Sequence, residues 1–202
     1  MAQRRGRGGG EKCRRGPGER MHVATVTSGN FNSGWTLRVE NSLANTFYTT
    51  GINNAGTSGF ADPSPSQPSL PSTGTYYVEV DPARTGTGMA DVTLFEFQDQ
   101  TAAATINGSA VPLSFTNQGQ NGYVTFSGTS GQQVTIRMTG NTIGWTSVTL
   151  RKPDGSYVTG TGGSSASFNT STVTLGSTGT YKIIVDPSST LTGSINVAVT
   201  SP

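Results

Sequence analysis

Residues 72–82 read Ser-Thr-Gly-Thr-Tyr-Tyr-Val-Glu-Val-Asp-Pro, and residues 177–187 read Ser-Thr-Gly-Thr-Tyr-Lys-Ile-Ile-Val-Asp-Pro. Both stretches are rich in the aromatic and β-branched residues that strands favour. The Asp-Pro that closes each one is typical of a strand end, because proline cannot donate a ladder hydrogen bond. The offset of 105 residues persists downstream, where Thr87-Gly88 matches Thr192-Gly193. Since similarity at a fixed period indicates duplication, the sequence predicts two copies of one β-module.

The second copy can be divided into strands from its sequence. Short β-rich runs separated by Gly, Pro, Asn and Ser fall at residues 110–115, 122–126, 133–138, 145–151, 156–159, 172–175, 179–186 and 193–200. Many short strands with turn residues between them are typical of two packed sheets. We therefore expect an all-β fold made of two tandem antiparallel β-sandwich modules of jelly-roll type.

The first copy lacks its beginning. Thr36-Leu37-Arg38 matches Thr149-Leu150-Arg151, and residues 18–21 match 131–134, but nothing corresponds to the two strands predicted within 103–130. The preceding residues are rich in Arg and Gly and show no apolar alternation. We expect a disordered basic tail (1–17), a truncated module (18–100) and a complete module (101–202). The tail is interpreted as the product of a truncated or misassigned start, or as an arm that binds nucleic acid.

The charge of the chain lies mainly in this tail. Residues 1–20 hold seven of the 13 basic side chains and two of the 11 acidic ones, so the remainder is mildly acidic and offers no basic groove for nucleic acid. The single cysteine, Cys13, excludes an internal disulfide. We see no apolar run long enough to span a membrane and no signal peptide, and the chain is expected to be a piece of a longer one.

Several of these motifs carry a resemblance to known proteins. They are Gly-Thr-Tyr-x-x-x-Val-Asp-Pro followed by Thr-Gly-x-x-x-Val in both copies, together with residues 119–128, 131–134 and 150–155. The chain resembles the tandem β-sandwich repeats of bacterial secreted and surface proteins, including some Rhs/YD-repeat proteins. More loosely, it resembles the pre-peptidase C-terminal domains of secreted hydrolases. The resemblance implies an extracellular or cell-surface location and a spacer, adhesive or binding role, and it supplies no catalytic residues.

An enzymatic function has little support in the sequence. The only histidine is His22, whose counterpart in the second copy is Thr135. A Ser–His–Asp triad would depend on His22, and a Cys–His pair would also need Cys13 in the tail. The carboxylates form no recurring pair of the kind that glycosidases use. We expect a protein that is not an enzyme.

Two aspartates recur at equivalent places, Asp81 and Asp186, each followed by proline. One interpretation is a calcium ligand, since Ca²⁺ prefers carboxylate and carbonyl oxygens. The other is an Asp-Pro turn that ends a strand, and it is favoured because one carboxylate per copy is a thin ligand set. No other cofactor is expected.

Aromatic residues are the remaining candidates for a binding site. Trp35 and Trp145 recur within Gly-Trp-Thr, and Tyr48, Tyr77, Tyr123 and Tyr157 accompany them. Exposed rings stack on the apolar faces of sugars, but each tryptophan is equally interpreted as a plug of its module's core, which we favour. Tyr76 and Tyr181, in the repeated stretch, are expected in the core with the hydroxyl bonded to a loop backbone.

The function expected from the sequence is a non-catalytic structural, adhesion or spacer module of a bacterial surface or secreted protein. The alternative is a carbohydrate-binding accessory module of a secreted hydrolase. Expected partners are other modules of a longer chain, a further chain added as a strand at an exposed sheet edge, or a polysaccharide. Neither nucleic acid nor a membrane span is expected.

Overall fold

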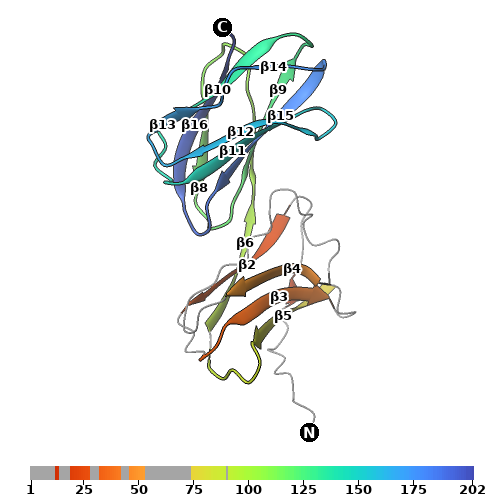
Figure 1. Cartoon of the computed structure of the whole chain (residues 1–202), viewed down its shortest axis with the longest axis vertical. Coiled ribbons are helices and arrows are strands. Elements are labelled where there is room, and N and C mark those ends of the chain that lie inside the picture. The colour runs from red at the N-terminus through yellow and green to blue at the C-terminus, as the bar shows by residue number, and fades with distance from the viewer. Residues whose placement is uncertain (1–11, 14–18, 28–31, 42–45, 53–73, 90) are drawn as a thin grey trace. The chain divides into compact units, whose positions relative to one another are not determined.

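The fold was examined in a computed structural model, which describes residues 12–13, 19–27, 32–41, 46–52, 74–89 and 91–202 (Figure 1). The chain divides into two compact units, Met1–Phe97 and Gln98–Pro202. Every regular element in the described ranges is a β-strand, which confirms the predicted all-β class. A helix able to cross a membrane is absent from these same ranges.

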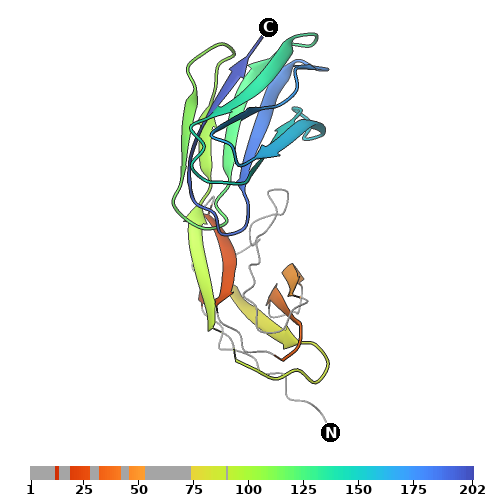
Figure 2. The same ribbon diagram turned by 60° about the vertical axis from the view of Figure 1, so that its left-hand side comes forward.

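The second unit contains two five-stranded sheets (Figures 1 and 2). The first, called here the β12–β7 sheet, has the order β12 (Tyr157–Gly163), β11 (Thr146–Arg151), β15 (Gly179–Pro187), β9 (Gly122–Gly128) and β7 (Gln100–Ala103). The second has the order β13 (Ser167–Asn169), β10 (Gln133–Thr139), β16 (Gly193–Thr200) and β8 (Val111–Phe115), with β14 (Val173–Thr174) also paired to β10. Neighbouring strands are antiparallel except for β7, which runs parallel to β9.

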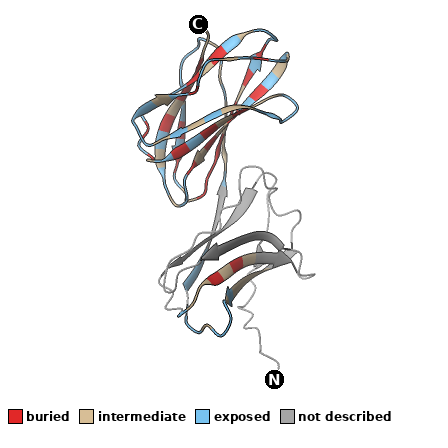
Figure 3. Ribbon diagram, in the orientation of Figure 1, coloured by how far each residue is buried: buried red, intermediate tan, exposed pale blue. Residues whose placement is uncertain are grey.

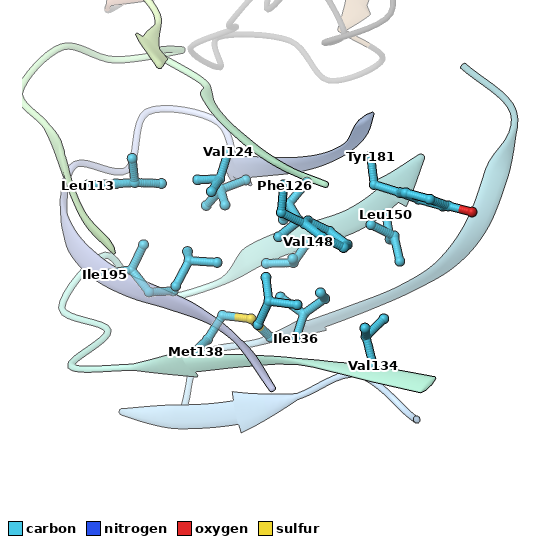
Figure 4. Close-up of a cluster of buried hydrophobic side chains, with 14 of the residues drawn as sticks. Leu113, Val124, Phe126, Val134, Ile136, Met138, Val148, Leu150, Tyr181 and Ile195 are labelled. Atoms are coloured by element: carbon cyan, nitrogen blue, oxygen red, sulfur yellow. The ribbon is translucent and has the colours of Figure 1, made fainter. Parts of the chain in front are cut away.

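The core of this unit lies between the two sheets. In β15 the side chains of Tyr181, Ile183 and Val185 are fully buried, and the residues between them are not, so that buried and exposed positions alternate in Figure 3. Figure 4 shows these side chains meeting those of the opposite sheet, such as Ile136 and Met138. Each large apolar side chain removed from water contributes about 1.5–3 kcal/mol. The repeated stretch therefore supplies the middle of the core.

All eight strands predicted for this unit are present, with shifted ends, but two further strands were not predicted. β7 has the sequence Gln-Thr-Ala-Ala and β13 has only three residues, so neither shows the β-branched alternation of a strand. β12 also extends through Gly160, Gly162 and Gly163, which the sequence would place in a loop. These segments are held in strands by pairing with stable neighbours, since the backbone carries the ladder hydrogen bonds.

The first unit has a four-stranded sheet with the order β1 (Lys12–Cys13), β5 (Gly74–Pro82), β3 (Trp35–Asn41) and β4 (Thr46–Ile52). A two-stranded sheet contains β2 (Glu19–Thr27) and β6 (Asp91–Gln98). Among the residues whose burial is described, Trp35 and Leu37 form the buried apolar part of this unit.

The ladder β4–β3–β5 has the same register as the ladder β12–β11–β15. Leu37 is paired with Val80 and Thr50, and Val148 is paired with Val185 and Thr161. Both ladders also carry an irregularity at the same place, after Val39 in β3 and after Leu150 in β11. Leu37 therefore corresponds to Val148, and the predicted match of Leu37 with Leu150 is wrong. The two alignments differ by two residues, so both keep the alternation and only the pairing partners distinguish them.

The prediction of a structureless tail is also wrong at one place. Lys12 pairs with Thr75 and Cys13 pairs with Gly74, at the positions where β9 pairs with β15 in the second unit. Strand pairing rests on backbone hydrogen bonds, so a two-residue strand needs no apolar alternation. The rest of residues 1–17 lies outside the described residues.

Candidate binding face

The outer surface of the β12–β7 sheet carries the exposed aromatic side chains of the second unit. Val148 and Leu150 of β11 point into the core, so the residues between them point outward. Trp145 directly precedes β11, shares this outward parity and is 55 % exposed, while Tyr157 at the start of β12 is 58 % exposed. In contrast, the aliphatic side chains that fill the core are almost wholly buried.

Each of these two rings lies over a glycine of β12. A Cβ atom on Gly162 would lie 3.2 Å from Cζ2 of Trp145, and one on Gly160 would lie 3.3 Å from the hydroxyl oxygen of Tyr157. The two glycines are on the same face of the strand, about 7 Å apart. A strand without side chains thus supports two neighbouring rings, which leaves ring surface open to solvent.

Two cations lie beside these rings. Arg151 of β11 and Lys182 of β15 are directly opposite in the ladder. The guanidinium carbon of Arg151 lies 6.0 Å from the ring centre of Tyr157, and Nζ of Lys182 lies 5.7 Å from that of Tyr123. Cations over ring faces are attracted by the ring quadrupole. We call the outward side chains of Trp145, Tyr157, Tyr123, Arg151 and Lys182 the aromatic face.

Trp35 does not form a second platform of this kind. It is 2 % exposed, so the interpretation of Trp35 as a ligand-binding ring is wrong and the core interpretation holds for it. In the ladder it pairs with Pro82, as Thr146 pairs with Pro187. Trp35 thus corresponds to Thr146, which is also buried, and not to Trp145. One residue of shift moves a side chain to the other side of a sheet.

Asp81 and Asp186 both lie at the ends of strands, β5 and β15, as the Asp-Pro interpretation predicts. The carboxylate of Asp81 is 3.3 Å from the guanidinium of Arg38. Arg38 also bonds Glu79 at 2.9 Å, and this hydrogen bond is the main cause that raises the pKa of Arg38. A calcium ion at Asp81 would have to compete with this cation. No cluster of three or more potential metal ligands occurs among the described residues.

The other candidates are placed less fully. His22 lies in β2 and Tyr48 in β4, but their side chains are outside the described residues. Tyr123 lies on the aromatic face, and Tyr77 in β5 is partly buried. The sequence analysis missed the contribution of Arg151 and Lys182. Their signal, two cations in strands 31 residues apart, has meaning only when the register is known.

No family model and no curated protein matches this chain. Among solved structures, it is similar to the pre-peptidase C-terminal domain of a collagenase from Bacillus anthracis, with 13% identity and a TM-score of 0.41 over 51% of this chain and 97% of that one. It is also similar to a periplasmic inhibitor of g-type lysozyme from Aeromonas hydrophila, with 17% identity and a TM-score of 0.35 over 50% of this chain and 98% of that one. Similarity this low carries no conclusion about function, and the resemblance to Rhs/YD-repeat proteins stays a prediction.

Proposed function

We propose that this chain is a non-catalytic adhesion module of a secreted or surface-exposed bacterial protein, and that it attaches to carbohydrate through the aromatic face. The observation that carries the proposal is the pair of exposed rings, Trp145 and Tyr157, each lying over a glycine of β12. This selects the adhesion role among those expected from the sequence, and it joins that role to the carbohydrate-binding alternative.

The physical basis is the fit between flat rings and sugar rings. The axial C–H groups of a pyranose form an apolar face that packs on an aromatic ring, while the hydroxyl groups at its edge remain in water. Covering about 100 Å² of ring surface contributes roughly 2.5 kcal/mol, before the cost of ordering the polymer is subtracted. Two rings therefore support weak binding at one module, of the kind that several modules or many sites on a polymer strengthen.

The test is retention of the protein on insoluble polysaccharides such as cellulose, chitin and xylan. We expect retention on at least one of them and a loss of at least tenfold in Trp145→Ala. Met89→Ala is a control, since Met89 is exposed but belongs to the first unit. Both variants should keep the circular dichroism of the parent protein. Absence of retention on every polysaccharide, or full retention of Trp145→Ala, would contradict the proposal.

A second candidate function is self-association by strand addition, and it is favoured by one edge of β5. In the second unit β9 covers this edge of β15 from Gly179 to Val185, whereas β1 covers only Gly74 and Thr75 of β5. Over residues 76–80 the described part of the chain contains no strand on this side. Such an edge pairs readily with another strand. A monomeric mass in solution together with slow amide exchange at residues 76–80 would exclude this role.

A further inference from the structure

We infer that the polymer bound by the aromatic face is an acidic polysaccharide, whose carboxylates are held by Arg151 and Lys182. This inference rests on the proposed function and names its ligand class. It starts from a feature that folding alone does not explain, the direct opposition of two cations on neighbouring strands.

Like charges placed opposite each other in an antiparallel pair are destabilising. Here nothing in the described residues offsets them, because neither Arg151 nor Lys182 forms an ion pair there. The acid nearest in sequence, Asp154, accepts hydrogen bonds from Ser156 in the turn that follows β11. An anion bound between the two cations would remove the repulsion.

The two cations are also held in place. Arg151 leans over Tyr157 on β12, and Lys182 leans over Tyr123 on β9, so each is directed to the flanking strand on its own side. Stacking leaves the N–H edges of a guanidinium available, and their planar fork matches a carboxylate. The pair therefore presents hydrogen-bond donors to solvent above the middle of the sheet.

The identity of the ligand follows from the combination of these groups. A neutral polysaccharide would use the rings over Gly160 and Gly162 but leave the cations unmatched. An acidic peptide would use the cations but has no ring face for Trp145. A uronate polymer supplies both, since every sugar ring carries a carboxylate. Charge complementarity of this kind also steers the polymer to the face.

The experiment compares polygalacturonate with its fully methyl-esterified form, which has the same backbone without the charge. We expect at least tenfold tighter binding of the acidic polymer, weakened by added salt. The double variant R151Q/K182Q should abolish that difference while its unfolding temperature stays equal or rises. The matched control is Arg137→Gln, because Arg137 is an exposed cation of β10, on the other sheet. Trp145→Ala should weaken the binding of both polymers.

The outcomes separate the inference from the proposed function. Equal binding of the acidic and esterified polymers, sensitive to Trp145→Ala but not to R151Q/K182Q, would overturn the inference and leave the adhesion role intact. Failure to bind either polymer or any neutral polysaccharide would overturn both. Equally tight binding of poly-glutamate, unaffected by Trp145→Ala, would identify a surface for acidic peptides and would also overturn the inference.

Discussion

The hydroxyl group of Tyr181 donates a hydrogen bond to the carbonyl oxygen of Ser177 at 2.8 Å and accepts one from the backbone N–H of the same residue at 3.2 Å. Tyr181 is fully buried, and its ring stacks on Phe126 with 5.5 Å between the ring centres. The tyrosine of the repeated stretch thus connects the core to the loop before β15. This confirms the expectation that its hydroxyl is bonded to a loop backbone.

Tyr181→Phe should lower the free energy of unfolding by about 1–3 kcal/mol. The ring and its packing remain, but Ser177 loses the partner of its N–H and of its carbonyl oxygen in a part-buried place. Urea denaturation measures the change as a lower midpoint with an unchanged slope.

The control for this variant is Tyr157→Phe, which removes a hydroxyl from an exposed tyrosine of the same unit. A change within about 0.5 kcal/mol is expected there, as for most surface substitutions. Equal effects of the two variants would show that the bond between Tyr181 and Ser177 contributes nothing to stability.

The glycine of the repeated Thr-Gly pair has a steric cause in the second unit. Gly193 has a φ of 144°, and a Cβ atom there would lie 2.9 Å from the backbone nitrogen of Ile143. Gly193→Ala should therefore lower the free energy of unfolding by at least about 2 kcal/mol. Gly176→Ala is the control, since a Cβ atom at Gly176 would meet nothing within 4 Å. Thermal unfolding of the two variants, compared with the parent, decides the matter, and similar midpoints would refute the steric explanation.

The two tryptophans show how far sequence alone could reach. Periodicity predicted the core correctly because the alternation of residues 179–186 needs no knowledge of the partner strand. The shared Gly-Trp-Thr, however, suggested that Trp35 and Trp145 are equivalent, although strand pairing matches Trp35 with Thr146. Local similarity outweighed the register there, since loops of different length hide a one-residue shift. The binding candidates Trp145 and Tyr157 were named from the sequence, but their position over glycines depends on pairing between β11 and β12.

Ser156→Ala should make the stability of the second unit depend less on pH. The hydroxyl and the backbone N–H of Ser156 both donate to Oδ1 of Asp154, at 2.7 and 2.9 Å, and they hold the pKa of this carboxyl below its ordinary value of 3.8. A carboxyl with a lowered pKa stabilises the fold above that ordinary value, and the contribution is lost as the pH falls through the folded-state pKa. The variant should therefore be less stable than the parent near pH 7, and the difference should vanish near pH 2.

Two measurements check this prediction. An NMR titration of the Asp154 carboxyl should give a higher pKa in Ser156→Ala than in the parent, and urea midpoints at the two pH values should converge only at the acidic one. Ser171→Ala, in an exposed loop serine, is the control and should change neither. A difference between parent and variant that stays constant with pH would assign the effect to packing and not to Asp154.

Gly162→Val should displace the indole ring of Trp145 without harming the fold. Valine suits an outward position of a strand, but its side chain would fill the space in which Trp145 lies, since a Cβ atom alone would come within 3.2 Å of the ring. Acrylamide quenching reports on this ring because Trp145 is 55 % exposed and Trp35 only 2 %. We expect stronger quenching and about tenfold weaker retention on the polysaccharide that binds the parent. Gly176→Val, where a Cβ atom has open space, should change neither. If Gly162→Val binds as tightly as the parent although its quenching has increased, the seat over Gly162 is not needed for adhesion.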